Sequence, residues 1–411
     1  MQKTAKVIYT KTKIEKMISK RIKNITSSPS VKMSAKVAEL IDAGEEVVSL
    51  NVGESDFQTP SRIIRATVNA LEGNKTRYSL VEGITELRDK IADKTNDAIT
   101  ELSTKSKIKV TRKNIILGNG SKHILYSLFQ SLLNPSDEVI INAPYWVTFP
   151  ESVKLAGGVP IIIDTKENFQ LDLKKIEESI SAKTKCVIIN SPNNPTGAIY
   201  PKSDLLKLIE MAKRKNFIIV SDEAYELLTY SQDKFCSPAF YHEEAFNYVL
   251  TVRSFSKSYG MTGFRIGYLV GPEEIVSAIH TLQSHLSGNN CTFAQYGALE
   301  ALEIEHQELK EIIDELKYRR DLLFNGLKSI FPHMVLPDGA FYLFAPLKDS
   351  GLQLNCEELA MDILDREKLA ILPGCYFGSP SHLRFSFASS REDIEKAIKK
   401  LHSYKSKVQK K

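Results

Sequence analysis

Lys257 lies between two serines in the stretch SFSKSYGMTGFRIGY, residues 254–268, and Arg265 follows it within an apolar run. A lysine that is removed from water loses its proton readily and attacks carbonyl groups, with which it forms a Schiff base. The planar guanidinium of an arginine offers two parallel hydrogen bonds to a phosphate or a carboxylate. Whether these two residues form a site depends on what other segments place beside them.

Two further stretches put polar groups where predicted strands end. LGNGSKHILYSLFQ, residues 117–130, indicates a strand end, a turn and a helix start, so the amides of Gly120, Ser121 and Lys122 would meet at a positive helix terminus that suits a phosphate. NSPNNPTGAIY, residues 190–200, holds asparagines between prolines. Each stretch alone is also explained by ordinary turn formation.

A third stretch, VSDEAYELL at residues 220–228, places Asp222 at the end of a predicted buried strand. A buried carboxylate requires a cation or a strong donor, and a protonated heteroaromatic nitrogen would serve. Tyr225 follows three residues later, on the same side if the chain turns as a helix. The structural alternative is that Asp222 caps a helix and Tyr225 packs.

Seven short runs rich in β-branched residues predict strands that must position these groups. They are residues 114–117, 137–142, 159–164, 186–190, 217–222, 248–252 and 264–271. Continuous apolar runs of this length favour strands covered on both faces, and helical patterns alternate with them. The sequence therefore predicts an α/β fold with a mostly parallel seven-stranded sheet, and ligands in such sheets bind beyond the carboxyl ends of the strands.

A second, smaller α+β unit is predicted at the C-terminus. Residues 294–329 have one long helical pattern, after which residues 339–347 and 382–388 resume strand character. A predicted helix at residues 34–44 could pack with this unit. We expect an N-terminal segment at 1–55, a large α/β domain at 56–304 and a small domain at 305–411.

Composition narrows the classes of function. The net charge of +5 comes from the ends, since residues 1–36 hold ten Lys and Arg against one acidic residue and residues 391–411 hold eight against three. The remainder carries −9, which argues against nucleic acid as a partner. The five cysteines are scattered and form no C-x-x-C pair, which fits a protein of the cytoplasm. No apolar run is long enough to span a membrane. The histidines lack the spacing of metal ligands.

Taken together, the stretches resemble one enzyme family. NVGESDFQTP, KTRYSLVEGITELR, APYW, NSPNNPTGAIYP, SDEAYE, SFSKSYGMTGFRIGY and HLRFSFA occur in the order found in the fold type I, class I aminotransferases that use pyridoxal 5′-phosphate. The resemblance runs from about residue 28 to the end and is greatest to the bacterial aspartate aminotransferase branch. GESDF stands here for the usual GEPDF, and FRIGY for WRIGY.

Carried over residue by residue, the resemblance implies that Lys257 forms the Schiff base with the cofactor and then moves a proton between the substrate Cα and C4′. Asp222 would pair with the pyridinium nitrogen and keep it protonated. Asn194 and Tyr225 would donate to the phenolic oxygen, and Trp146 would stack on the ring.

The same resemblance implies contacts to the phosphate and to the substrate. The expected phosphate contacts are Gly120, Ser121, Lys122, Ser254, Arg265 and the partner subunit's Tyr78, which makes the protein a homodimer. The expected substrate contacts are Gly53, Ser30, Lys122, Trp146, Asn194 and Arg384. Among these, Arg384 would bind the α-carboxylate with the Gly53 backbone, Lys122 would bind a distal carboxylate, and Ser30 stands where relatives carry threonine.

The activity that the resemblance implies is ping-pong transfer of an amino group from an L-amino acid, with aspartate or another acidic amino acid favoured, to a 2-oxo acid such as 2-oxoglutarate. Aromatic or neutral amino acids and prephenate remain alternatives, as does a C–S lyase that uses the same lysine. A regulatory module that binds without turnover is the alternative from another class. No metal is expected.

Overall fold

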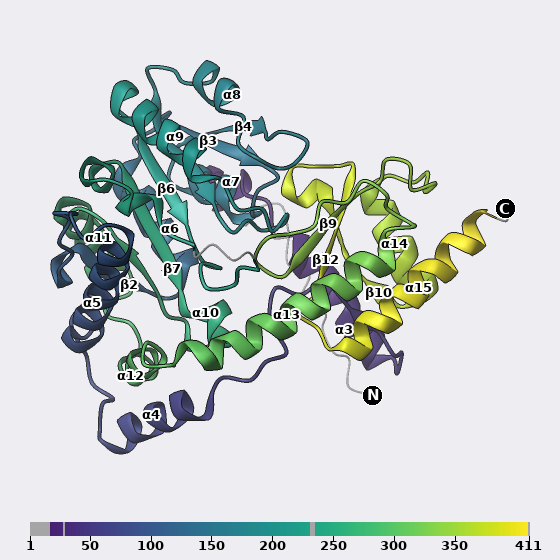
Figure 1. The fold of residues 1–411 in the computed structure, drawn as a ribbon, viewed down its shortest axis with the longest axis horizontal. Helices are drawn as coiled ribbons and strands as arrows, with labels where there is room; N and C mark the ends of the chain where they lie inside the picture. The colour runs from purple at the N-terminus through teal and green to yellow at the C-terminus, as the bar shows by residue number, and fades with distance from the viewer. Residues whose placement is uncertain (1–16, 28, 231–234, 410–411) are drawn as a thin grey trace, which may run out of the picture.

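A seven-stranded sheet forms the centre of the larger part of the protein, in the computed structural model, which describes residues 17–27, 29–230 and 235–409 (Figure 1). The strand order is β2-β8-β7-β6-β5-β3-β4. The strands are β2 (Ile115–Gly118), β3 (Glu138–Ala143), β4 (Val159–Asp164), β5 (Thr184–Asn190), β6 (Ile218–Asp222), β7 (Val249–Ser254) and β8 (Gly267–Val270). The predicted seven-stranded, mostly parallel sheet is confirmed.

The register of this sheet brings the predicted strand ends together. β5, β6 and β7 are parallel neighbours, so that Asn190 at the end of β5 pairs with Asp222 at the end of β6. β8 runs antiparallel to β7 and β2, and Gly267 at its start pairs with Ser254 at the end of β7. Because β8 runs the opposite way, the residues that precede it arrive at the same edge as the carboxyl ends of its neighbours.

Helices cover both faces of the sheet, as the apolar runs require. On one face, the apolar core draws on α4 (Ser61–Glu72), α5 (Thr85–Leu102), α8 (Leu173–Glu178), α9 (Lys202–Lys215) and α12 (Thr292–Ala301). On the other face it draws on α6 (Ser121–Leu132), α7 (Thr148–Leu155) and α11 (Glu273–Leu286). The short helices nearby are α2 (Lys20–Lys23), α10 (Phe255–Ser258) and the 3-10 turns 112–114, 238–240, 243–247 and 262–264.

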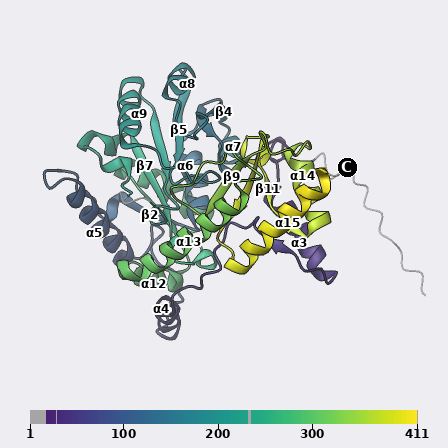
Figure 2. The ribbon, with the colours of Figure 1, turned by 45° about the vertical axis from the view of Figure 1, so that its right-hand side comes forward.

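A second core lies beside the first and is built from both ends of the chain. Its strands are β1 (Val48–Ser49), β9 (Tyr342–Pro346), β10 (Leu369–Ala370), β11 (Leu372–Pro373) and β12 (His382–Ser386). Its helices are α3 (Pro29–Asp42), α13 (His306–Leu327), α14 (Cys356–Glu367) and α15 (Arg391–Gln409). Figures 1 and 2 both show α3, α14 and α15 gathered around β9. The strands pair as β11-β12-β9, antiparallel, and as β1-β10, parallel.

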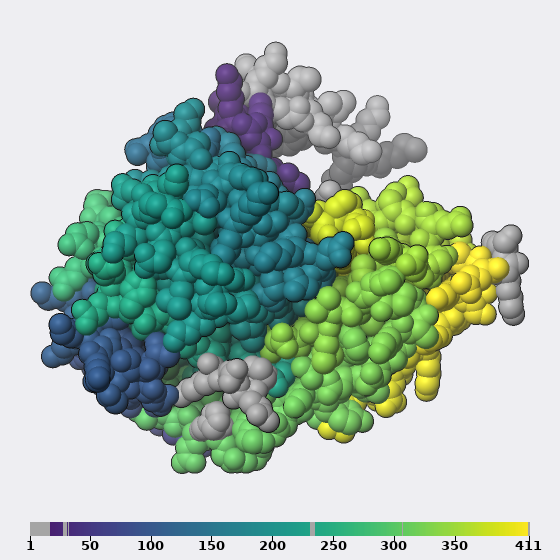
Figure 3. Space-filling model, turned by 45° about the horizontal axis from the view of Figure 1, so that its top comes forward, coloured from purple at the N-terminus to yellow at the C-terminus, as the bar shows by residue number. Residues whose placement is uncertain are grey.

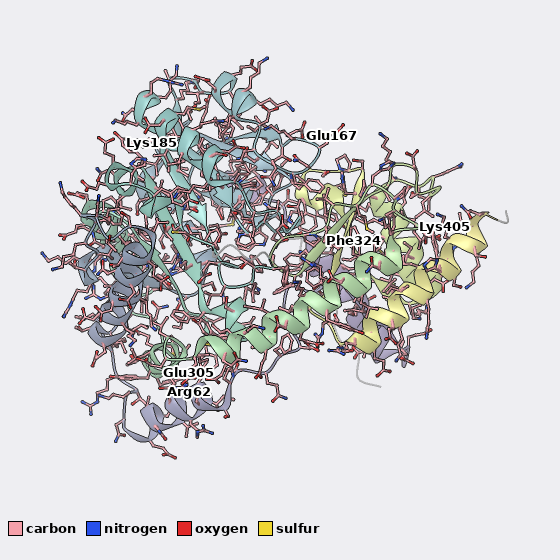
Figure 4. All side chains as sticks on the ribbon, in the orientation of Figure 1. Arg62, Glu167, Lys185, Glu305, Phe324 and Lys405 are labelled. Atoms are coloured by element: carbon pink, nitrogen blue, oxygen red, sulfur yellow. The ribbon has the colours of Figure 1, made fainter. Side chains whose placement is uncertain are left out.

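The two parts lie side by side (Figure 3), and α13 runs from one to the other (Figure 1). Figure 4 labels Arg62 of α4 and Glu305, just before α13 begins, and Arg62 Nη1 donates to Glu308 Oε1 of α13 at 3.4 Å. There Arg62 Nε donates to Glu300 Oε1 at 2.7 Å. Phe324, near the other end of α13, packs against the second core. In the described residues, no helix is long and apolar enough to cross a membrane.

Most predicted element bounds differ from the structure by a few residues, and three differences are larger or change the kind of element. The single helix expected at 294–329 is wrong, because α12 ends at Ala301 and α13 starts at His306. α12 is held against α4 so closely that a Cβ on Gly297 would lie 2.3 Å from Thr67 Oγ1, whereas α13 leaves for the other core. β8 begins at Gly267 rather than 264, since Arg265 has φ +56°. A turn, not a helix, follows Asp222.

Candidate active site

A cavity of about 390 Å³ lies at the carboxyl ends of β5 and β6, between the two parts of the protein. It is lined by Ser34, Asn51, Val52, Gly53, Glu54, Ser121, Trp146, Val147, Asn190, Asn194, Asp222, Ala224, Tyr225, Ser256, Lys257, Thr262, Arg265, Tyr342, Leu372, Tyr376, Phe377 and Arg384. Nine residues predicted from the sequence are therefore brought together, from Gly53 to Arg384, and both cores contribute to the walls.

Lys257 enters the cavity from α10, directly after β7. Its Nζ donates a hydrogen bond to the carbonyl oxygen of Gly53 at 2.6 Å. Burial lowers the pKa of the Lys257 amine to about 8; the carboxylate of Glu54 opposes this shift, and the cations Arg265, Arg384 and Lys122 add to it. At pH 7 roughly a tenth of this amine is consequently uncharged and nucleophilic, far more than of a surface lysine.

Asp222 stands at the end of β6 and is almost fully buried, with 3% of its surface exposed. Its Oδ1 accepts a hydrogen bond from the amide of Ala224 at 3.2 Å. No lysine, arginine or histidine in the described ranges forms an ion pair with it. Burial raises the pKa of Asp222 from 3.8 to about 7, more than the Ala224 amide and Lys257 lower it. The carboxylate is therefore poised to accept a cationic partner.

The start of α6 and the loop before β8 form a corner rich in hydrogen-bond donors. Gly120 caps α6 with φ +80°, and a Cβ there would lie 2.5 Å from Arg265 Nη2. A Cβ on Gly267 would lie 2.4 Å from the amide nitrogen of Ser121. The two glycines thus let the backbone approach closely. The amide of Gly120 already donates to Gly118 O at 2.7 Å, which leaves the amides of Ser121 and Lys122 at the helix start, with Arg265 beside them, to form an anion site.

Arg265 is held in this corner by its own loop. Its Nη1 donates to Thr262 O at 2.9 Å and its Nη2 to Asn119 O at 3.2 Å. Both acceptors are backbone carbonyls, so the guanidinium is fixed in direction, and no carboxylate in the described part of the chain forms an ion pair with it. The charge stays available for an anion.

Arg384 reaches the opposite side of the cavity from β12. It is 4% exposed, and its guanidinium lies between the rings of Tyr342 and Phe377, at 4.3 and 5.0 Å. Its Nη1 donates to Asn194 Oδ1 at 3.1 Å and its Nη2 to Asn51 O at 2.7 Å. Nε has no partner among the described residues, and burial lowers the pKa of the group. A buried cation with a free donor is suited to a carboxylate ligand.

Aromatic and amide groups complete the walls. The hydroxyls of Tyr225 and Tyr342 lie 2.9 Å apart. Burial, and next the neighbouring Tyr342, raise the pKa of Tyr225, so its hydroxyl keeps its proton and can donate. Trp146 lines the cavity, and Lys122 Nζ lies 5.1 Å from the centre of its ring. Burial, and next the charge of Arg265, lower the pKa of Lys122.

Several predicted residues do not line this cavity. Ser254 is buried, and its Oγ accepts a hydrogen bond from the Ser256 amide at 3.1 Å, so it caps α10. Gly120 and Lys122 flank the lining residue Ser121 at the start of α6 but are not themselves among the lining residues. Tyr78 is 98% exposed and is not among the residues that line the cavity of its own chain. The side chain of Ser30 is outside the described residues.

Other lining residues were missed by the sequence reasoning. Asn190 Nδ2 donates to Asp222 O at 2.9 Å, and its Oδ1 accepts from the Asn194 amide at 2.8 Å, so Asn190 fixes both neighbours. Its place at the end of the strand run CVIIN was a usable signal. Glu54 lies within the quoted stretch NVGESDFQTP, next to Gly53, but no role was assigned to it. Ser34 and Tyr342 lie outside the quoted stretches, and no spacing pattern indicates them.

The residues fit pyridoxal phosphate. The cofactor needs a nucleophilic amine for its aldehyde, an anion site for its phosphate and a carboxylate for its ring nitrogen. Lys257, the corner at Gly120 and Arg265, and the buried Asp222 meet these needs within one cavity. Asp222, whose pKa is raised by burial, is the strongest indication of this cofactor, because a cationic partner such as the protonated ring nitrogen would stabilise its buried carboxylate.

Comparisons with known proteins give the same family as the sequence resemblance. The family described as "Aminotransferase class I and II" matches residues 45–401. A probable aspartate/prephenate aminotransferase of Aquifex aeolicus is 39% identical over 94% of this chain and 98% of its own. The crystal structure of aspartate aminotransferase from Thermotoga maritima superposes with a TM-score of 0.87 at 35% identity, covering 94% of this chain and 99% of that one. Thermus thermophilus aspartate aminotransferase with maleate gives 0.86 at 37% identity, covering 93% and 98%.

Proposed function

The chain belongs to the class I and II aminotransferases, enzymes that depend on pyridoxal phosphate, and from this we propose that it moves the amino group of an acidic L-amino acid to a 2-oxo acid such as 2-oxoglutarate. One observation carries the proposal: Lys257, Asp222 and Arg384 meet in a single cavity. When bound, the cofactor supplies an aldehyde that condenses with amines and a ring that accepts the electrons of the broken Cα–H bond.

The residues of the chain then divide the work. Lys257 Nζ, whose pKa of about 8 lies near neutral pH, can take a proton from the substrate Cα and return one. Arg384 would orient the substrate by its α-carboxylate, because its guanidinium is already fixed by Asn194, Asn51 and two aromatic rings. Asp222 would hold the positive charge of the cofactor ring nitrogen.

Around the ring, Tyr225 and Asn194 would donate to the phenolic oxygen, and Trp146 would cover one face. Gly53 would close over the substrate carboxylate. In the donor-rich corner, the amides of Ser121 and its neighbours, with Arg265 and Ser254, would hold the phosphate, and Ser30 would contact the substrate.

An acidic substrate is favoured by charge. Lys122, Arg265 and Arg384 give this region three cations that could meet anions. The cofactor brings one phosphate and every amino acid substrate brings one α-carboxylate, so one cation is left for a second carboxylate. The relatives described as aspartate or aspartate/prephenate aminotransferases, and the one with bound maleate, act on or bind dicarboxylates. We therefore assign the distal carboxylate to Lys122.

Replacing Lys122 with methionine tests this assignment. We expect kcat/KM for aspartate to fall by about 10- to 100-fold, the worth of one charge-assisted hydrogen bond, while turnover of phenylalanine and alanine stays within twofold. The measurement is a panel of amino donors against 2-oxoglutarate and oxaloacetate. Lys202→Met is the matched control, since Lys202 also lies over an aromatic ring, Tyr241, on the surface. Unchanged turnover of aspartate by Lys122→Met contradicts the assignment.

The lyase alternative has its own test. Wild-type enzyme that releases pyruvate from cysteine conjugates in the absence of a keto acid would be a lyase.

We also propose that the protein is a homodimer in which the partner subunit's Tyr78 completes the phosphate site. Tyr78 is 98% exposed, and the neighbouring α4 exposes Ile64 and Val68 by 47% and 43%, an apolar surface that a second copy would cover.

Mixing two inactive variants tests the shared site. Tyr78→Ala chains and Lys257→Ala chains are each expected to have little activity. Their hybrid dimer would contain one intact site, since the Tyr78→Ala chain keeps Lys257 and receives Tyr78 from its partner. We expect mixing after dissociation to restore activity, up to half that of the wild type in the hybrid, as followed by sedimentation and turnover. Hybrids that form without regaining activity contradict the arrangement.

Two further assignments follow from the fold and the composition. We propose a division into residues 1–55, 56–304 and 305–411, supported by the two separate cores and by β1 pairing with β10. We propose that the enzyme acts in the cytoplasm, supported by five cysteines that form no disulfide among the described residues.

A further inference from the structure

Glu54 is a carboxylate at the cavity that the chemistry above does not use. It lines the cavity together with Lys257 and Thr262. Thr262 Oγ1 donates a hydrogen bond to Glu54 Oε1. The preceding residue, Gly53, has the carbonyl that accepts the hydrogen bond from Lys257 Nζ at 2.6 Å. The carboxylate of Glu54 is consequently attached one residue away from the group that the lysine amine contacts.

The segment that carries Glu54 is fixed at both ends. Arg384 Nη2 donates to Asn51 O at 2.7 Å on one side. On the other side, Thr59 Oγ1 donates to Gly260 O at 2.5 Å. Thr262, which holds the carboxylate itself, also accepts from Arg265 Nη1 at 2.9 Å through its carbonyl. The position of Glu54 is therefore set by contacts to the loop that carries Arg265, the arginine proposed to bind the phosphate.

The charges around Lys257 leave a role for this carboxylate. The titratable and charged groups that face it are Glu54, Asp222, Tyr225, Lys122, Arg265 and Arg384. Three of them are cations, which together with burial lower the pKa of the amine. Asp222 is buried and, in the proposed function, serves the cofactor. Glu54 is the remaining carboxylate, and it raises the pKa of the amine.

We propose that Glu54 is a positioning residue for Lys257: its carboxylate, held by Thr262 in the wall of the same cavity, favours the ammonium form of Nζ by its charge and sets how readily Nζ gives up its proton. This inference deepens the proposed function and rests on it. Without the carboxylate, the amine faces three cations and loses its proton at lower pH. The carboxylate thereby determines the pH range over which Nζ can both accept and return a proton.

Two substitutions separate charge from position. Glu54→Gln keeps an acceptor for Thr262 Oγ1 and removes the charge, whereas Thr262→Val keeps the charge and removes the hydrogen bond. Glu311→Gln, on the exposed side of α13, is the matched control. In cofactor-free protein, the rate at which Lys257 is acetylated is measured against pH by mass spectrometry of its peptide. We expect the midpoint to fall by roughly 0.5–1 pH unit in Glu54→Gln, by less in Thr262→Val, and to stay fixed in the control.

A second readout uses the loaded enzyme. The pH at which the visible absorbance of the bound cofactor changes is expected to move in the same direction in Glu54→Gln. A folded Glu54→Gln protein whose acetylation midpoint equals that of the wild type overturns the inference. Borohydride reduction keeps the two ideas apart: if it attaches pyridoxyl to Lys257 of the wild type and the midpoint does not move, only the role of Glu54 is lost. If borohydride reduction attaches no pyridoxyl group to Lys257 of the wild type, the proposed function itself is contradicted.

Discussion

Replacing Lys257 with alanine lowers kcat for transamination by about 10⁴-fold or more, because one amine serves both as the covalent anchor of the cofactor and as the group that moves the proton at Cα. The visible absorbance that appears when the cofactor is added to the wild type is expected to be lost as well. Turnover and absorbance spectra of the purified variant are the measurements.

Lys257→Arg sharpens this experiment. It keeps a cation next to Gly53 O and Glu54, but a guanidinium does not lose its proton and cannot attack the aldehyde. It should therefore be as inactive as Lys257→Ala while folding normally. Borohydride treatment of the wild type should label the peptide that contains Lys257 and no other. A Lys257→Ala protein that still turns over, or a label on another lysine, would contradict the assignment.

Asp222→Asn is expected to lower kcat by about 10²- to 10³-fold, the usual cost of removing one preorganised electrostatic contact from an active site. The amide has the same shape and can still accept from the Ala224 amide, but it carries no charge to hold the ring nitrogen protonated. Cofactor affinity should fall together with kcat. Turnover, and titration of the bound cofactor by absorbance, measure both effects; a variant with wild-type kcat contradicts the pairing.

The same substitution should stabilise the cofactor-free protein at high pH. Burial raises the pKa of Asp222 from 3.8 to about 7, so between these values the folded state holds a proton that the unfolded state releases. Protonated Asp222 therefore costs the folded wild type nothing at low pH, and the wild type loses stability as the pH rises from about 4 to about 7. Between pH 5 and pH 8, the unfolding free energy of Asp222→Asn should gain about 3 kcal/mol relative to the wild type, as measured by urea titration. A difference that does not change with pH would contradict the raised pKa.

Much of the fold could be predicted because buried parallel strands have a strong sequence signal. The run at 159–164 matches β4 in full, and the other runs overlap their strands. The break between α12 and α13 had no such signal, since residues 302–305 contain neither glycine nor proline and the helical pattern runs through them. Packing in two different cores decides that break. The start of β8 was missed because the left-handed backbone of Arg265 depends on its tertiary contacts.

The candidate site divides in the same way. Lys257, Asp222 and the start of α6 follow strands directly, so the edge of the sheet brings them together and the sequence suffices. Arg384 was found only through the resemblance to a family. The place of Glu54 and Tyr342 at the cavity was not predicted. It depends on how the second core packs against the first, and no local sequence pattern indicates that packing.

The pairing of β1 with β10 has a consequence for how the chain is made. Val48 lies beside Leu369, so the first strand of the second core leaves the ribosome roughly 320 residues before its neighbour, a wait of some tens of seconds at ordinary rates of translation. The central sheet can close during that interval, and the segment with Gly53 and Glu54 can dock only after nearly the whole protein has been synthesised. A nascent chain would thus acquire its lysine, its carboxylate and its donor-rich corner well before it acquires a complete wall around them.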